Sequence, residues 1–209
     1  MTKQARYLTH PQVAIDPSIP IPEWRLSETG LARVERLVRA EPWPKTTRIV
    51  ASAERKAIDT AVCLAAAWQV PMEVRPKMHE NDRSATGYLS PTAFEAAADR
   101  FFARPQDSMC GWETAKAAQV RILSEALDHV WHHLEGDVLF VGHGAVGTLL
   151  YCALAGLPID RRYDQPHGGG NWFSFDIDSR QVRHHWRSME EAFDAQSEAD
   201  VVLGKAEHA

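Results

Sequence analysis

The chain has 209 residues, of which 44% are hydrophobic and 24% are charged, and its formal net charge is −5. These values are typical of a globular protein with a substantial core, and the negative charge gives no reason to expect nucleic-acid binding. No apolar run approaches the ~20 residues of a membrane span, and residues 1–10 lack the apolar core of a signal peptide. Cys63, Cys110 and Cys152 are scattered without CxxC spacing, so we expect free thiols in a reducing compartment, the cytoplasm.

The first two thirds of the chain alternate between strand-like and helix-like patterns. The short apolar runs are rich in β-branched residues, and the longer runs repeat apolar residues at helical spacing. In chain order, the expected elements are a strand at 6–9, a loop with four prolines at 11–25, a helix at 27–40, a strand at 47–52, a helix at 54–68, a strand at 72–75, a polar loop at 76–90 and helices at 91–102 and 113–134.

The segment DVLFVGHGAVGTLLYCALAG, residues 137–156, is the most informative part of the sequence. It predicts a buried strand, a glycine-lined turn and an apolar helix, which Gly156-Leu157-Pro158 ends. His143 stands in the turn between Gly142 and Gly144, at the amino end of the helix, where backbone N–H groups favour anions.

The last part of the chain predicts a β-hairpin and a tail. Gly168–Gly170 precede two strands, at 172–177 and 181–186, with a turn at Asp178-Ser179. From Ser188 the chain is acidic and weakly helical. The pattern favours one domain over residues 1–187 and a peripheral tail at 188–209. Its architecture would be a three-layer α/β/α sandwich with a mostly parallel sheet and an antiparallel edge hairpin, an edge at which a second copy could pair as a homodimer.

Three polar residues stand where expected strands end: His10, Ser52 and His143. The carboxyl ends of parallel strands meet at one edge of a sheet, which is where ligands bind in such folds. Neutral imidazole can attack phosphorus, nearby cations can hold phosphoryl oxygens, and a carboxylic acid can protonate the leaving alkoxide. Glu80, in the polar loop, and the Arg55-Lys56 pair could complete such a site without a metal or other cofactor.

The order of these pieces resembles the histidine phosphatase superfamily, whose fold is phosphoglycerate mutase-like. In that family a strand ends in Arg-His-Gly, a helix opens with Leu-Thr/Ser-x-x-Gly, a strand ends in Ser-Ser before a helix with Arg-Ala-x-x-Thr-Ala, a glutamate follows in a loop, and a strand ends in Ser-His-Gly. The matching segments here are Leu8-Thr9-His10-Pro11, Leu26-Ser27-Glu28-Thr29-Gly30, Val50-Ala51-Ser52, Lys56-Ala57-Ile58-Asp59-Thr60-Ala61, Glu80 and Val141-Gly142-His143-Gly144. The match spans residues 6–156.

The resemblance implies a metal-independent phosphomonoester hydrolase acting on a small phosphorylated substrate or a phosphoprotein. His10 would become the phosphohistidine, His143 would be the second histidine of the phosphate pocket, and Glu80 would donate the proton. Thr9 and Gly144 flank these histidines and would adjoin the phosphate.

The sequence departs from the family at the two arginines that would bind phosphate. Thr9 stands where the arginine before the nucleophile is expected, and Lys56 stands where the helix arginine is expected. A lysine keeps the charge but lacks the bidentate fork of a guanidinium. Arg55 or Arg83 could supply the missing cation. The departures also favour an alternative, a phosphate- or phospholigand-binding protein that has lost turnover.

Three other patterns point elsewhere. Residues 142–147 spell GxGxxG, a dinucleotide fingerprint, but no strand ending in an acidic residue follows about 20 residues later. The paired histidines at 132–133 and 184–185 could indicate metal, although adjacent side chains point apart. Gly168–Gly170 could be a connector or a phosphate cradle.

Overall fold

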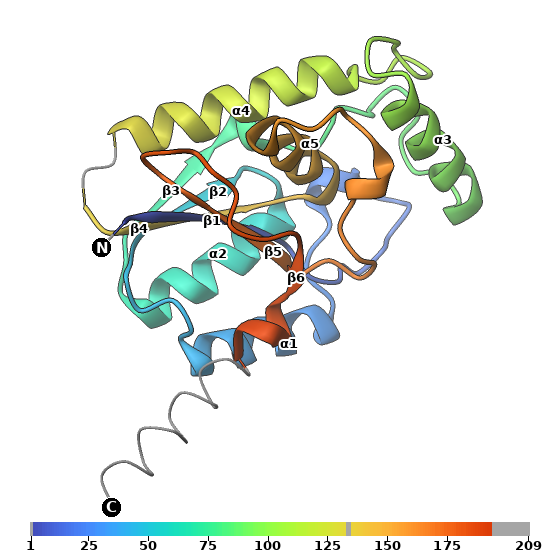
Figure 1. The fold of residues 1–209 in the computed structure, drawn as a ribbon. Helices are drawn as coiled ribbons and strands as arrows, with labels where there is room; N and C mark the ends of the chain where they lie inside the picture. Colours follow the sequence, from blue (N-terminus) through green and yellow to red (C-terminus); the bar gives the residue numbers. More distant parts are fainter. Residues whose placement is uncertain (1, 133–134, 194–209) are drawn as a thin grey trace, which may run out of the picture.

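The computed structural model describes residues 2–132 and 135–193. Within them, six strands form one sheet in the order β3-β2-β4-β1-β5-β6 (Figure 1). The strands β3, β2, β4 and β1 are parallel, and β5 runs antiparallel to β1. Their bounds are β1 Gln4–Thr9, β2 Thr46–Ser52, β3 Met72–Arg75, β4 Asp137–Gly142, β5 Asn171–Asp176 and β6 Arg187–Ser188.

Helices cover both faces of the sheet. In Figure 1, α4 and α5 lie on one face and α1 and α2 on the other, while α3 stands to one side. The three-layer sandwich predicted from the sequence is therefore confirmed. The helices are α1 Glu28–Ala40, α2 Arg55–Trp68, α3 Pro91–Ala103, α4 Ala115–His132 and α5 Gly144–Ala155, with short 3-10 turns η1 Ile21–Glu23, η2 Pro76–Met78 and η3 Arg161–Tyr163.

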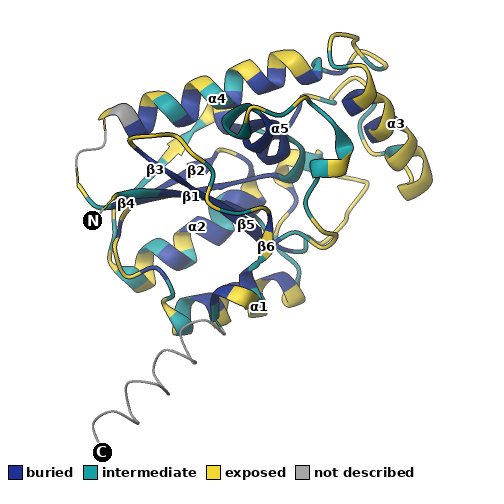
Figure 2. Cartoon of the chain, in the orientation of Figure 1, coloured by how far each residue is buried: buried dark blue, intermediate teal, exposed yellow. Residues whose placement is uncertain are grey.

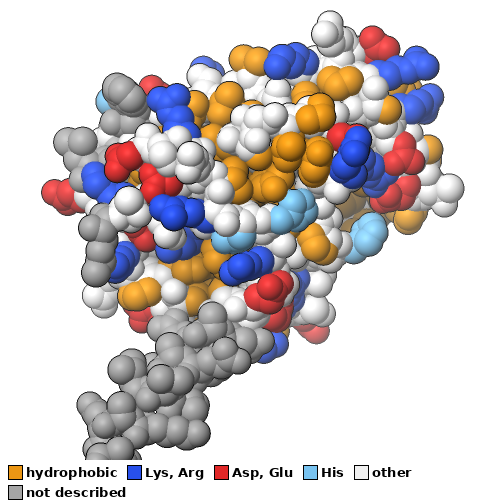
Figure 3. Space-filling view, viewed as in Figure 1, with side chains coloured by type: hydrophobic (Ala, Val, Ile, Leu, Met, Phe, Trp, Pro, Cys, Tyr) orange, Lys and Arg blue, Asp and Glu red, His pale blue; other side chains and the backbone are white. Residues whose placement is uncertain are grey.

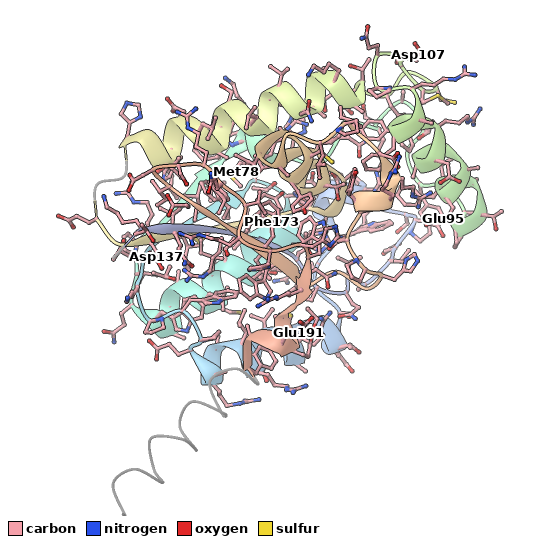
Figure 4. The ribbon with its side chains drawn as sticks, in the orientation of Figure 1. Met78, Glu95, Asp107, Asp137, Phe173 and Glu191 are labelled. Atoms are coloured by element: carbon pink, nitrogen blue, oxygen red, sulfur yellow. The ribbon has the colours of Figure 1, made fainter. Side chains whose placement is uncertain are left out.

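The sheet separates two hydrophobic clusters because successive side chains of a strand point to opposite faces. Tyr7 and Phe140 belong to the cluster on the α4–α5 side, and Leu8 and Leu139 belong to the cluster on the α1–α2 side. Figure 2 shows the strands as the most buried part of the molecule, and Figure 4 labels Phe173, which is fully buried between the layers. This two-sided burial explains the continuous apolar run of β4.

The outer surface of the α4–α5 layer is partly apolar. Figure 3 shows hydrophobic side chains gathered over α5 and between α5 and α4, with charged side chains around them. No helix within residues 2–132 and 135–193 is both long and apolar enough to cross a bilayer.

The predicted second strand of the edge hairpin, 181–186, is wrong. Only Val182 forms an isolated antiparallel bridge, to Phe175, and the paired strand is the two-residue β6. The apolar residues of 181–186 pack inward instead: the Trp186 ring lies 4.9 Å from that of Phe173, and its N–H donates to the carbonyl of Tyr163. Two backbone hydrogen bonds join residues 181–183 to β5, and beyond them side-chain packing accounts for the apolar pattern of this segment.

The start of the predicted peripheral tail belongs to the domain. Met189 is fully buried and Ala192 is nearly so, both in the cluster on the α1–α2 side. Glu190 accepts a hydrogen bond from Arg33 of α1 at 2.7 Å. The rest of the expected tail, 194–209, lies outside the described residues, as do the last two residues of the helix expected at 113–134.

Candidate active site

The carboxyl ends of β1, β2 and β4 meet at one edge of the sheet, with β4 in the middle. His10 follows β1, Ser52 ends β2 and His143 follows β4. The two imidazole rings lie edge to face with their centroids 5.3 Å apart. Residues that are 133 positions apart in the sequence are thus brought together by parallel pairing of their strands.

The backbone and ring of His10 are both fixed. Its N–H donates to Gly142 O at 2.9 Å and its carbonyl accepts from Gly170 N at 3.0 Å. The ring Nδ1 donates to the carbonyl of Pro11 at 2.8 Å, which leaves the lone pair on Nε2. Burial lowers the pKa of His10 to about 4, against the opposing effect of the Pro11 bond. The imidazole is therefore neutral and nucleophilic at pH 7.

His143 presents an unpaired nitrogen to the same space. Its Nε2 lies 2.8 Å from the Ser52 hydroxyl, which accepts from the backbone N–H of Glu54 and so has its own proton left to donate. We assign the imidazole proton to Nδ1 on this basis. That Nδ1 is buried and has no hydrogen-bond partner among the described residues. Burial lowers the pKa of His143 well below its usual value. A neutral ring with a free N–H is a ready donor to an anionic oxygen.

Tyr7 holds the turn that carries His143. The Tyr7 hydroxyl accepts from His143 N at 3.0 Å and donates to His143 O at 3.2 Å. A Cβ at Gly142 would come within 2.2 Å of this hydroxyl, and one at Gly147 within 2.5 Å of the Tyr7 ring. Close packing on Tyr7 thus explains these two glycines of the GxGxxG pattern, with no dinucleotide required.

Glu80 lies at the amino end of α5. Its carboxylate accepts backbone hydrogen bonds from Ala145 at 3.1 Å and Val146 at 3.0 Å, in addition to that of Asn81. Burial raises the pKa of Glu80, although these bonds and Arg83 oppose the effect. A raised pKa suits a carboxyl group that must hold a proton near neutral pH.

Arg121 of α4 supports the loop that carries Glu80. Its guanidinium donates to the carbonyls of Lys77 and His79, at 2.7 and 2.9 Å. It also forms a largely buried ion pair with Glu113 at 2.6 Å. Sequence reasoning missed this residue because its role depends on contacts more than 40 positions away in the chain.

Glu54 is a further site residue that the sequence analysis missed. One carboxylate oxygen is paired with the Lys56 ammonium, and the other accepts from Glu80 N and lies 3.6 Å from His143 Nε2. Burial alone would raise the pKa of Glu54, but nearby positive charge, that of Lys56 included, and the Glu80 N–H outweigh it and lower that pKa below its usual range. A permanently ionised carboxylate therefore stands beside the pocket cation. The sequence feature that could have identified Glu54 as a site residue was its position two residues before Lys56.

The three cations proposed from the sequence differ in position. Lys56 is buried and donates to Ile21 O at 2.9 Å. Arg55 points to Asp59, one turn on, at 2.9 Å, with 43% of its side chain exposed. Arg83 lines a cavity of about 480 Å³ together with Glu54 and Glu80. Because its charge lowers the pKa of both histidines, Arg83 lies within electrostatic range of the site.

Thr9 faces the loop before β5. Its hydroxyl lies 2.7 Å from Gln165 Oε1 and accepts from Asn171 N at 3.0 Å. Asn171 Nδ2 donates to the same Gln165 oxygen at 3.1 Å, so that oxygen is held from two sides. The Gln165 Nε2 lies over Gly144, where an added Cβ would come within 2.3 Å of it. Gln165 thus approaches the start of α5, and nothing in the irregular sequence of 156–170 predicted this.

Gly168–Gly170 support His10 through their backbone. All three have positive φ, and a Cβ at Gly169 would come within 2.3 Å of His10 O. Arg33 donates to the carbonyls of Gly168 and Gly169 at 3.3 and 3.0 Å. The Gly170 carbonyl accepts from the backbone N–H of Met189 at 2.8 Å. The positive φ values and the lack of a Cβ let these glycines approach His10 closely.

Comparisons with known proteins agree with this geometry. The family model of the histidine phosphatase superfamily (branch 1) matches residues 20–188. Bacillus stearothermophilus YhfR superposes with a TM-score of 0.73 at 19% identity, covering 87% of this chain and 94% of that one. A mycobacterial glucosyl-3-phosphoglycerate phosphatase complexed with VO3 gives 0.71 at 20% identity, covering 88% and 96%. The alpha-ribazole phosphatase of Shigella flexneri gives 0.63 at 16% identity, covering 88% and 95%. A comparison with curated proteins found no match.

These structural likenesses establish the fold, and the family model covers most of the chain, including the segments that carry His143, Glu80 and Lys56. Together with the paired histidines at the strand ends, they show that the chain belongs to the histidine phosphatase superfamily, branch 1.

Proposed function

We propose that this protein hydrolyses phosphomonoesters through a phosphohistidine on His10. Membership of the family favours phosphatase-type chemistry. The observation that carries the proposal is the anchoring of His10: with Nδ1 bonded to Pro11 O at 2.8 Å, the lone pair of a neutral ring is left on Nε2. The His143 ring lies 5.3 Å from that of His10, and its Nδ1 has no hydrogen-bond partner among the described residues.

In the first step, His10 Nε2 attacks phosphorus and the bond from phosphorus to the ester oxygen breaks. The proton of Glu80 passes to the departing oxygen, so the leaving group is released as an alcohol. His143 Nδ1, Lys56, Arg83 and the N–H of Gly144 hold the three phosphoryl oxygens. In the second step, water attacks phosphorus, its proton goes to Glu80, and the P–N bond breaks to restore neutral His10.

Phosphate release from a panel of phosphomonoesters tests this proposal. The assay is run in EDTA, with the parent protein, His10→Ala and His167→Ala, an exposed histidine that serves as the matched control. We expect release by the parent and the control and none by His10→Ala. A rapid quench in alkaline detergent, which preserves an acid-labile P–N bond, should recover the phosphate on the parent and the His167→Ala control but not on His10→Ala. Turnover by His10→Ala equal to that of the parent would refute the role of His10.

A second candidate function is phospholigand binding without turnover. The observation that favours it is the pairing of Glu54 with Lys56, since a buried carboxylate offsets the cation that should hold the phosphoryl group. Thr9 adds no charge where the family has an arginine. Binding of vanadate by a parent protein that forms no phosphohistidine would select this candidate.

We place either function in the cytoplasm, because all three cysteines are free thiols. The partner would be a small phosphorylated molecule or a phosphoprotein. A second copy pairing at the sheet edge stays a prediction, and the edge strand β6 offers only two residues for it.

A further inference from the structure

The cavity beside the reacting groups is lined by both polar and apolar residues. Its lining includes the polar residues Glu54, Glu80 and Arg83, and also Pro20, Ile21 and Pro22 at the start of η1. Its volume is about 480 Å³, far more than a phosphoryl group fills. Because Glu80, the proposed proton donor to the departing oxygen, lines this cavity, the cavity is a suitable place for the leaving group.

A second cavity of about 260 Å³ adjoins the first. Ile21 and Arg83 line both, so the two spaces meet at these side chains. The remaining lining residues of the second cavity are mostly apolar or aromatic: Ile15, Trp24, Tyr88, Leu89, Pro91, Phe94 and Glu95. A leaving group that starts at Glu80 can therefore extend past Arg83 into an aromatic chamber.

Few polar side-chain atoms of this chamber are left for a ligand. The Trp24 N–H donates to the carbonyl of Asp16 at 2.8 Å. Glu95 is paired with Arg161. The Arg83 guanidinium lies over the Phe94 ring, 4.7 Å from its centroid. A sugar placed here would leave hydroxyl groups without partners, which costs binding energy.

The chamber is instead suited to an aromatic ring. The Trp24 and Tyr88 rings lie 6.0 Å apart and are tilted to each other by 57°, which leaves ring faces and edges for a third ring. Ile15 and Tyr88 are among the few large hydrophobic side chains that are more than a third exposed. A ligand that covered them would remove apolar surface from water.

One unpaired donor belongs to the lining of the first cavity. Asn81 lines the first cavity, is 6% exposed, and its amide nitrogen has no hydrogen-bond partner among the described residues. A buried amide that lacks a partner is costly unless a ligand supplies an acceptor. The ester oxygen or a neighbouring acceptor of the substrate would supply it.

We propose that the substrates are phosphomonoesters whose leaving group ends in an aromatic ring, and that Tyr88, Trp24 and Ile15 bind that ring. This specificity rests on the phosphatase activity proposed above. It requires the ring to lie a short linker away from the ester oxygen, because the chamber begins beyond Arg83.

A pair of esters that differ only in a phenyl group measures the contribution of the aromatic ring to kcat/KM. Propyl phosphate and 3-phenylpropyl phosphate release alkoxides of nearly equal basicity, so their kcat/KM values differ chiefly through binding of the phenyl group. We expect the parent to favour the phenyl ester by about 10- to 100-fold, which corresponds to burial of one aromatic ring. Tyr88→Ala and Ile15→Ser should each lower this ratio severalfold. The control Val120→Ser, which changes an exposed apolar residue of α4, should leave it unchanged.

Two phosphonates test binding of the ring even if the protein hydrolyses no ester. Calorimetric titration with butylphosphonate and 4-phenylbutylphosphonate compares the same pair of tails without any reaction. Tighter binding of the phenyl compound, lost in Tyr88→Ala, would support the chamber even in a protein without turnover. Equal affinity for the two phosphonates, or equal kcat/KM for the two esters, would overturn the proposal while leaving the phosphohistidine mechanism intact.

Discussion

Glu54 and Lys56 form an ion pair inside the proposed phosphate pocket, with their side chains only 10% and 5% exposed. Lys56 also donates to Ile21 O, so its ammonium is held by the protein before any ligand binds. An incoming phosphoryl group therefore meets a lysine whose charge is already balanced. The charge of this pair, rather than the lysine alone, decides how strongly the pocket attracts an anion.

Replacing Glu54 by glutamine should strengthen anion binding. Glu54→Gln removes a charge that is ionised throughout the neutral range and frees Lys56 to interact with the anion. We expect vanadate to bind about tenfold more tightly, a gain of ~1.4 kcal/mol. Titration calorimetry measures the change, and Glu28→Gln, an exposed carboxylate at the start of α1, is the control for net charge. Weaker binding by Glu54→Gln would show that Glu54 serves chiefly to position Lys56.

Gln165 should contribute to anion binding, and Thr9 should act through it. The Thr9 hydroxyl lies 2.7 Å from Gln165 Oε1, which aligns the amide so that its Nε2 lies over Gly144. Gln165→Ala should weaken vanadate binding several-fold because a donor at the start of α5 is lost. Thr9→Val should weaken it by a similar factor.

A double-mutant cycle distinguishes this coupling from two separate effects. If Thr9 acts only by orienting Gln165, the double variant should bind vanadate no more weakly than Gln165→Ala alone. Gln181→Ala, in the exposed 178–181 turn, is the control for removing a glutamine side chain. Additive losses would show that Thr9 has a role of its own.

The pH dependence should be bell-shaped, with its two limbs assigned to His10 and Glu80. Burial lowers the pKa of His10 to about 4, so the nucleophile stays neutral above that value and activity falls only as the pH approaches it. Burial raises the pKa of Glu80, so the protonated acid persists to higher pH than an ordinary carboxyl group, and activity falls as it ionises. The kcat/KM for propyl phosphate, corrected for the ionisation of the ester itself, measures both limbs.

The leaving group provides the control for this assignment. The phenolate of 4-nitrophenyl phosphate departs without a proton, so Glu80→Gln should form the phosphohistidine from it at a nearly parental rate. The same variant should be slowed by at least about a hundredfold with propyl phosphate. Equal losses with both esters would contradict the role of Glu80 as proton donor.

The sequence predicted the layers of the fold because the strand and helix periods are distinct in this chain. The run 138–141 is buried on both sides, and only a central strand combines such burial with helices on both faces. The residues at strand ends were predictable for the same reason: parallel strands bring His10 and His143 to one edge whatever the loops do.

The residues that the sequence did not predict are positioned by tertiary contacts rather than by the regular spacing of side chains along a helix or a strand. Glu54 follows a strand in a turn, where neither helical nor strand spacing assigns a direction to its side chain. Gln165 lies in a loop whose path is set by bonds to Thr9 and Asn171. The 181–186 segment had the alternation of a strand, but it pairs with β5 only at the Val182 bridge, and Trp186 packs on Phe173. Tertiary contacts decided each of these cases.

The Tyr7→Phe variant should show how much the Tyr7 hydroxyl contributes to structural support of the site, as distinct from the chemistry of the reaction. The variant keeps the ring that packs on Gly147 but leaves His143 N without the hydroxyl it donates to, in a position with no access to water. We expect a loss of about 1–3 kcal/mol in the free energy of unfolding, measured in urea, because a buried donor becomes unpaired. Anion binding should also weaken, since the turn carrying His143 loses its anchor to β1. Tyr151→Phe, on the same side of the sheet, is the matched control. A Tyr7→Phe protein with parental stability and parental vanadate affinity would show that the strand pairing of β1 with β4 holds His143 without help from the hydroxyl.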